Sequence, residues 1–174
     1  MLAGIETILP HWDDNQTTLL QAEQPQIVKC RHPELVPSIL AALPTALIWC
    51  RSSGEGYDVG NIADSYAHWA PTLTQYSQHI LGYAIGNEIN SPSHFIDPNG
   101  WARSVGARPT TIQSPVPLAT PGLVPYVRID EWRTALDLLK LPMRSVHCYW
   151  QGSPVEAVAA ALDPARGTPA KQIL

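Results

Sequence analysis

Asn87 and Glu88 are the residues of this chain whose types and position best suit chemistry. They follow Ile80–Gly86, a run of apolar and small residues that is typical of a strand buried on both faces. Burying a carboxylate without compensation costs on the order of several kcal/mol, so a Glu at the end of a core strand needs an explanation. In parallel α/β folds, active sites form at the carboxyl ends of the strands. The pattern therefore predicts a site at Glu88, and the alternative is a structural carboxylate paired inside the end of the sheet.

A second set of candidate residues lies near position 150. His147 and Tyr149 are two positions apart in the predicted strand Met143–Trp150, so both are expected on one face of that strand. Trp150 follows directly, and an indole ring is a common surface for stacking a sugar. The alternative is a buried His that is satisfied by hydrogen bonds, beside an ordinary core Tyr.

The segment Gly86–Asn90 resembles the end of the fourth barrel strand in the clan A glycoside hydrolases. His147-x-Tyr149 resembles the sixth-strand pattern of family 5 in that clan. The resemblance implies an α/β fold, an incomplete (β/α)8 TIM barrel with about six to seven parallel strands, and a carbohydrate as the partner molecule. It also implies that Glu88 is the general acid/base and that the cleft is lined by Asn87, His147, Tyr149 and Trp150.

Two more residues are expected on the same catalytic face. Arg51 closes the third predicted strand, where the resemblance implies an Arg that orients a catalytic carboxylate through a forked hydrogen bond; a surface salt bridge is the alternative. Trp12 belongs to the loop after the first strand and is expected to contact substrate. The cluster His11–Asp14 lacks a defined spacing of metal ligands, so we expect no metal site there.

The chain departs from the clan at the nucleophile, which in that clan is a Glu at the end of the seventh strand. Here Lys171–Leu174 opens that strand and contains no Glu, while Glu6 and Glu55 do not occupy the family's position. A retaining glycosidase needs two carboxyl groups about 5–5.5 Å apart. Three hypotheses follow: a weak or inactive glycosidase-like enzyme, a non-catalytic carbohydrate-binding or structural barrel, and a truncated chain whose missing part is supplied elsewhere.

The hydrophobic pattern predicts alternating strands and helices in a single domain, residues 1–174. Strands are predicted at 4–9, 26–31, 45–51, 80–86, 110–114, 143–150 and, in part, 171–174. Helices are predicted at 17–23, 33–43, 101–105, 129–139 and 153–162, and from a cap at Asn61 to a kink or break at Pro71. Such alternation favours right-handed βαβ units and a parallel sheet. A complete barrel takes about 250 residues, so we expect an open sheet whose edges are covered in a homo-oligomer.

The composition argues against several classes of function. A net charge of −4 with 15% charged residues argues against a nucleic-acid-binding surface. The sequence has no glycine-rich phosphate loop, and we expect no cofactor. Three Cys residues without C-x-x-C spacing, together with no signal-like or membrane-spanning run, predict a cytoplasmic protein with reduced thiols and no membrane partner.

Overall fold

The computed structural model describes most of the 174 residues. These are residues 4–7, 12–51, 59–91, 97–106, 114–123, 127–145 and 171–173, of which 4–7, 59–65, 106 and 171–173 are described by their backbone alone. Among the described residues, no helix has both the length and the apolar character that crossing a membrane requires.

The described strands form a single sheet of seven parallel strands that pair strictly in chain order. Their bounds are β1 Gly4–Thr7, β2 Ile27–Cys30, β3 Leu47–Arg51, β4 Ile80–Ala84, β5 Leu118–Thr120, β6 Met143–Ser145 and β7 Lys171–Ile173. The strands predicted at 4–9, 26–31, 45–51, 80–86 and 171–174 are confirmed with slightly different ends. β6 confirms the start of the strand predicted at 143–150, whose remainder lies outside the described residues.

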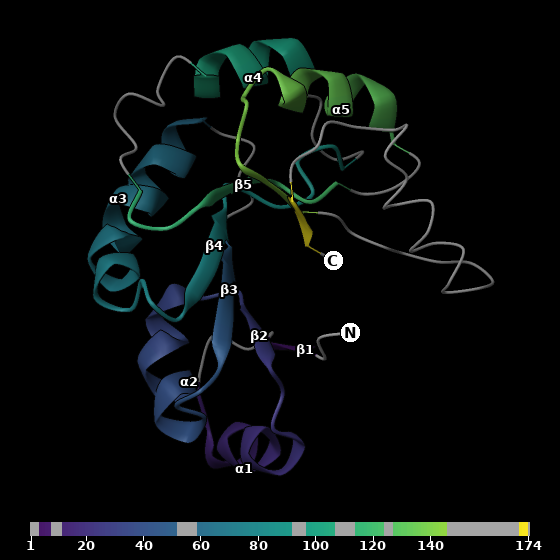
Figure 1. Ribbon diagram of the computed structural model, residues 1–174. Helices are drawn as coiled ribbons and strands as arrows, with labels where there is room; N and C mark the ends of the chain where they lie inside the picture. The colour runs from purple at the N-terminus through teal and green to yellow at the C-terminus, as the bar shows by residue number, and fades with distance from the viewer. Residues whose placement is uncertain are drawn as a thin grey trace, which may run out of the picture.

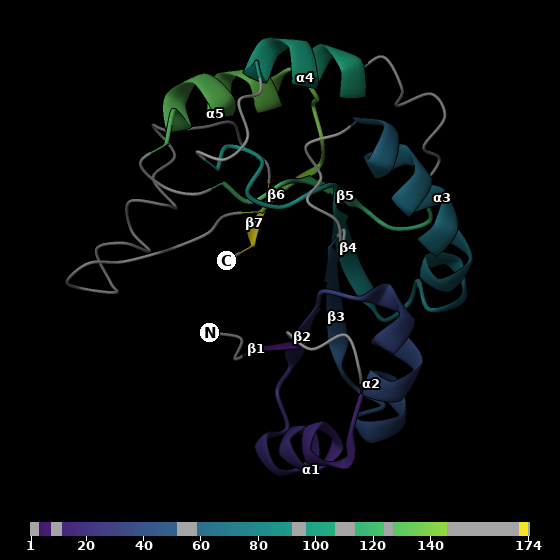
Figure 2. The same cartoon turned by 180° about the vertical axis from the view of Figure 1, so that it is seen from behind.

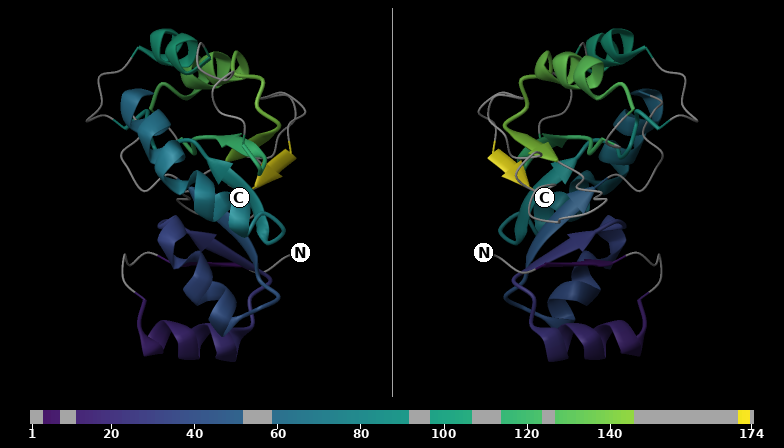
Figure 3. Two further views of the ribbon diagram at one scale, coloured as in Figure 1. Left: turned by 90° about the vertical axis from the view of Figure 1, so that its left-hand side faces the viewer. Right: turned by 90° about the vertical axis from the view of Figure 1, so that its right-hand side faces the viewer.

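Helices connect these strands. Their bounds are α1 Asp14–Glu23, α2 Val36–Ala42 after a short 3-10 helix η1 Pro33–Leu35, α3 Val59–Gln75, α4 Pro98–Gly106 and α5 Ile129–Asp137. Figures 1 and 2 show the helices around the outer side of a curved sheet that has β1 and β7 at its two ends. Seen from the side, the chain rises from α1 at one end of the molecule to α4 and α5 at the other (Figure 3). The sheet and its helices therefore have the layout of an open barrel.

Two apolar clusters lie on the two faces of the sheet, because successive side chains of a strand point to opposite sides. The outer cluster combines strand residues such as Val28, Ile48 and Tyr83 with helix residues such as Ile39 and Leu73, all at most 1% exposed. The inner cluster is built from strand residues alone: Trp49, Ala84, Ala119 and Met143, with Ile27 and Leu81 packed against them. Because no helix residue joins the inner cluster, it marks the barrel interior.

The structure differs from the predicted elements at β5 and in α3. The fifth described strand is Leu118–Thr120, and the strand predicted at 110–114 lies almost entirely outside the described residues. Pro117 contributes to the ladder only as an acceptor, since its carbonyl receives the N–H of Tyr83 at 2.9 Å. Of the kink or break predicted at Pro71, the break is wrong, because α3 runs through Pro71. The predicted cap is also wrong, because Asn61 lies inside that helix. A Pro costs a helix one hydrogen bond, and the packing of Leu73 against the outer cluster retains the helix here.

Both α1 and α4 begin earlier than predicted because of Asp caps. Asp13 accepts a hydrogen bond from the Gln16 N–H at 2.8 Å, while the Gln16 side chain accepts from the Asp13 N–H, which is a complete capping box. Asp97 caps α4 in a related way, with its Oδ2 accepting from the Gly100 N–H at 2.7 Å.

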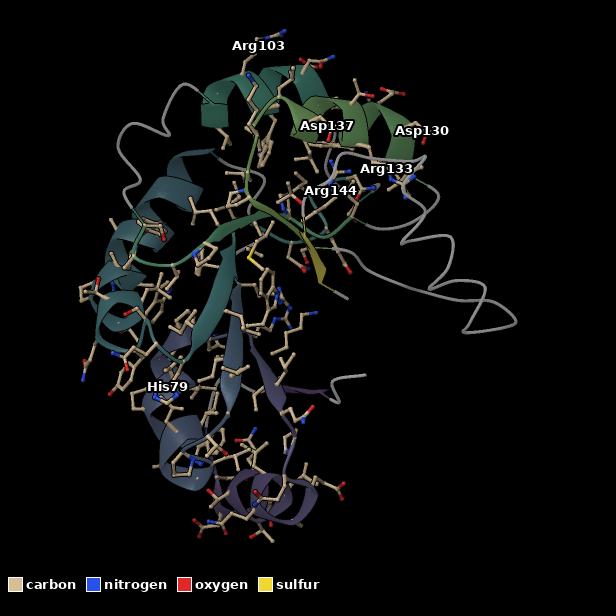
Figure 4. All side chains as sticks on the ribbon, in the orientation of Figure 1. His79, Arg103, Asp130, Arg133, Asp137 and Arg144 are labelled. Carbon is tan, nitrogen blue, oxygen red and sulfur yellow. The ribbon has the colours of Figure 1, made fainter. Side chains whose placement is uncertain are left out.

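An ion pair joins α5 to the sheet. Arg144 of β6 donates to Asp137 at the end of α5 (Figure 4). The Arg144 side chain is only 11% exposed. Arg144 stands on the helix-facing side of β6, opposite to Met143 of the inner cluster, so this pair ties the helix layer to the strand.

Candidate functional site

Glu88 follows the carboxyl end of β4 in an unusual backbone conformation. Its φ is 50°, in the left-handed region, and it comes two residues after Gly86, whose φ is 114°. The Glu88 N–H donates to the Gly122 carbonyl at 2.7 Å, and Asn87 forms a parallel bridge with the same Gly122 just beyond β5. Asn87 and Glu88 are both half-buried. The end of β5 thus holds Glu88 in place at the edge where the resemblance implied the general acid/base.

A tight turn fixes the chain on the other side of Glu88. The Ser91 N–H donates to the Glu88 carbonyl at 2.9 Å, so Ile89 and Asn90 are the central residues of the turn. Ile89 is fully buried in the outer cluster. Asn90 is 2% exposed, and its Nδ2 donates to the Val127 carbonyl at 2.7 Å. The loop after β4 is therefore joined to the loop after β5 at two points.

Arg51 ends β3 on the inner face of the sheet. It follows Trp49 of the inner cluster by two positions, and its Cα pairs in register with Ala84 of β4. Arg51 is 7% exposed. Burying a cation is costly unless polar or charged groups compensate it, and Arg51 does take part in interactions with other groups in this structure. Ala84 and Ala119, which follow Arg51 in register on the next two strands, have small side chains and so leave space for the long Arg51 side chain.

Trp49 fills the interior beneath Arg51. A Cβ built on Gly82 would lie 2.7 Å from Trp49 Cζ3 and 3.0 Å from the sulfur of Met143. Only a glycine therefore fits between the indole ring and β4. The Trp49 side chain fills the barrel interior next to the candidate site.

The structure places Trp12 just before Asp13, the N-cap residue of α1. Its indole N–H donates to Thr17 Oγ1 at 2.8 Å, and its ring packs against the outer cluster, so its described contacts are with the helix layer. His147, Tyr149 and Trp150 lie outside the described residues. The site residues that the structure brings to neighbouring strand ends are therefore Arg51, Asn87 and Glu88.

Sequence reasoning missed Asn90, Gly122 and the Trp49–Gly82 contact. Asn90 stands only two positions after Glu88 in the same polar run, which was a signal for it. Gly122 carried no comparable signal, because its role depends on the register between β4 and β5. Among the residues that the structure describes, no group of three or more His, Cys, Asp or Glu side chains is arranged to hold a metal ion.

Comparison with known proteins supports the fold. No family model matches the sequence. No curated protein sequence matches it at a significant level. Among solved structures, the catalytic domain of a mannanase from Streptomyces sp. SirexAA-E has a TM-score of 0.64 at 16% identity, over 99% of this chain and 64% of that chain.

A second solved structure has different chemistry. The 2,3-dimethylmalate lyase of the PEP mutase/isocitrate lyase superfamily has a TM-score of 0.56 at 8% identity, over 93% of this chain and 63% of that chain. This chain thus spans less than two thirds of the length of either structure. At such low identity the likeness shows the fold alone, and function must be argued from the site. The chain therefore has an incomplete (β/α)8 TIM-barrel fold, which it shares with both the mannanase domain and the lyase.

Proposed function

We propose that this chain is a glycoside-hydrolase-like protein that binds a carbohydrate at the carboxyl ends of β3, β4 and β5. Glu88 is the general acid/base of the site, and Asn87 contacts the sugar beside it. The observation that carries the proposal is the left-handed backbone of Glu88 at the carboxyl end of β4. A left-handed residue other than Gly costs about 1–2 kcal/mol, and such residues cluster at functional sites.

The position of the carboxylate supports the same assignment. In (β/α) barrels, residues at the carboxyl ends of the strands carry out the chemistry, whereas the opposite end mainly contributes stability. Arg51 ends the neighbouring strand on the inner face, where a guanidinium can orient a carboxylate or a sugar hydroxyl. We therefore assign Arg51 to substrate binding or to orientation of Glu88.

The remaining contacts follow from the resemblance to clan A, family 5. His147, Tyr149 and Trp150 are proposed to line the cleft, and Trp12 to bound it near the end of β1. The mannanase domain is the most useful guide to a ligand, because it shares the fold over nearly the whole of this chain. Manno-oligosaccharides are therefore the first ligands to test.

A retaining mechanism needs a second carboxylate on the opposite face of the sugar from the proton donor. Neither Glu6 nor Glu55 occupies the position of the clan A nucleophile. We therefore keep as the second candidate a carbohydrate-binding barrel without catalysis, in which Glu88 contacts the sugar and neither of these acids acts as the nucleophile.

The test measures binding and turnover separately. Calorimetric titration with manno-oligosaccharides measures binding, and release of nitrophenol from an aryl mannoside measures hydrolysis. Glu88→Gln keeps the shape of the side chain and is expected to weaken binding and to abolish any residual hydrolysis. Glu23→Gln, at the exposed end of α1, is the matched control and should change neither.

Three outcomes distinguish the hypotheses. Robust hydrolysis that Glu88→Gln abolishes would mean that another acid, such as Glu6, Glu55 or one from a second chain, replaces the nucleophile. Binding that Glu88→Gln leaves unchanged would favour the non-catalytic barrel. No saturable binding across a panel of β-linked oligosaccharides would overturn the carbohydrate proposal.

A further inference from the structure

Asn90 is the most deeply buried polar side chain among the described residues of the loop that carries Glu88. It is 2% exposed, and it occupies the second central position of the turn closed by the Ser91 N–H and the Glu88 carbonyl. A buried amide that lost its hydrogen bonds would cost about 1–3 kcal/mol, so this position tolerates an Asn only because its partners are in place.

The partner of Asn90 lies far away in the sequence. Asn90 Nδ2 donates to the Val127 carbonyl at 2.7 Å, across 37 positions, just before α5 begins. The Glu88 N–H donates to Gly122 in the same connection between β5 and α5. Two hydrogen bonds, one from residue 88 and one from residue 90, thus hold the intervening turn against the next loop of the barrel.

These bonds offset the strain at Glu88. A left-handed Glu is unfavourable on its own and persists only where the surrounding structure overdetermines the backbone. Ile89, buried between the two bonded residues, restrains the turn further through packing. Released from Val127, the turn could rotate Glu88 back to a negative φ.

We propose that Asn90 is a positioning residue: its hydrogen bond to Val127 keeps Glu88 in the left-handed conformation and so fixes where the carboxylate of Glu88 lies. This inference rests on the proposed function for its biological meaning, but its structural part stands by itself. Asp is the informative substitution, because it keeps the size of the side chain while replacing the donated N–H with an oxygen that repels the Val127 carbonyl.

The test follows the backbone of Glu88 by NMR, through its amide–Hα coupling and backbone shifts, and follows manno-oligosaccharide affinity in the same samples. In Asn90→Asp we expect the positive φ at residue 88 to be lost or averaged and the affinity to fall about tenfold, as expected from one lost buried hydrogen bond. Asn99→Asp makes the same chemical change at an exposed position of α4 and should alter neither quantity. An unchanged positive φ in Asn90→Asp would overturn the proposal.

The two readouts separate the positioning role from the proposed function. If the wild-type chain binds no saccharide, the proposed function fails, yet the coupling at Glu88 still decides whether Asn90 sets the backbone. If φ changes while affinity does not, Asn90 positions Glu88 but Glu88 is not in the binding site, which overturns the functional part.

A double-mutant cycle covers the case in which Asn90→Asp does not fold. Glu88→Gly removes the left-handed strain, so it should raise the urea midpoint more in the wild-type background than in Asn90→Ala, where the turn has already relaxed. The entropy that Gly adds to the unfolded chain is common to both backgrounds and cancels. Equal shifts in the two backgrounds would show that Asn90 does not act through residue 88.

Discussion

Trp49 and Gly82 face each other inside the barrel so closely that a methyl group at position 82 would lie 2.7 Å from the indole ring. Because the same methyl group would approach the Pro117 carbonyl at 3.0 Å, backbone as well as side chains would have to move. We expect Gly82→Ala to lower the free energy of unfolding by about 1–3 kcal/mol, as overpacking does. Urea denaturation measures this loss.

Reducing the ring at position 49 provides the control. Trp49→Leu in the Gly82→Ala background removes the ring that the methyl group meets, so the two substitutions together should cost less than the sum of their separate costs. Strict additivity would show that the Trp49 ring is not what excludes a side chain at position 82.

Backbone strain at Glu88 predicts an unusual order of stability. Glu88→Gly should be more stable than Glu88→Ala by about 1 kcal/mol, because Gly adopts a left-handed φ without the steric cost that Ala retains. At Glu131, in the right-handed helix α5, the same pair should differ by about 1 kcal/mol in the opposite direction. Thermal unfolding of the four variants tests this, and the same sign at both positions would contradict a left-handed Glu88.

Asp137→Asn tests the ion pair between α5 and β6. The substitution leaves the guanidinium of Arg144 largely buried without its charged partner, so we expect a loss of about 1–3 kcal/mol, below the figure for a fully buried pair because Asp137 is 33% exposed. Asp130→Asn, on the same helix, breaks a pair with Arg133 (Figure 4), and the Asp130 carboxylate in that pair is 93% exposed. That control should cost less than about 0.5 kcal/mol, and equal losses would contradict the difference in burial.

Cys50 predicts a loss of stability at alkaline pH. A hydrogen bond with Cys30, and then burial, raise the pKa of the Cys50 thiol well above its ordinary value. In the unfolded chain the thiol ionises near pH 8.5, whereas in the folded protein it stays protonated. The contribution of Cys50 to the free energy of unfolding is therefore complete below about pH 8.5. It declines as the pH rises further, since the unfolded state then binds fewer protons than the folded state.

Denaturation between pH 7 and pH 10 measures this decline. The free energy of unfolding should depend less on pH in Cys50→Val than in Cys148→Ser. The second variant is the reference, because it lacks only the thiol that lies outside the Cys30–Cys50 pair. A thiol reagent should meanwhile react with Cys30 and Cys50 only as fast as the protein unfolds, because both are buried. Rapid reaction in the folded protein would contradict the hydrogen-bonded pair.

We also expect the chain to self-associate. In the part of the chain that the structure describes, β1 pairs only with β2 and β7 only with β6, so the open edges are β1 and β7. Unpaired strand edges recruit other strands, and a twofold dimer is the simplest way to cover both. Light scattering should show a mass above that of the monomer at roughly tens of micromolar, a typical range for interfaces of ordinary size. A monomer at every concentration would contradict this prediction.

The run Ile80–Gly86 was readable from the sequence because a single segment carries its own pattern: an apolar strand, small residues and then a polar pair. β5 was not, since Leu118–Thr120 is only three residues long and is flanked by prolines, whereas Thr110–Ile112 has the stronger intrinsic preference for strand. The bond from Asn90 to Val127 could not be predicted either, because it depends on how two loops meet after the sheet has formed.

Strict pairing in chain order has a consequence for how the protein is made. Every strand pairs with the strand that precedes or follows it in the sequence, so no pairing among the described strands has to wait for a distant segment. Low sequence separation between contacting segments reduces the entropy lost in closing each loop, and it favours fast folding. On the ribosome, β1 to β4 with their helices can assemble while β5 is still being synthesised, so the strand that leads to Glu88 is formed before the loop that holds Glu88 in place emerges.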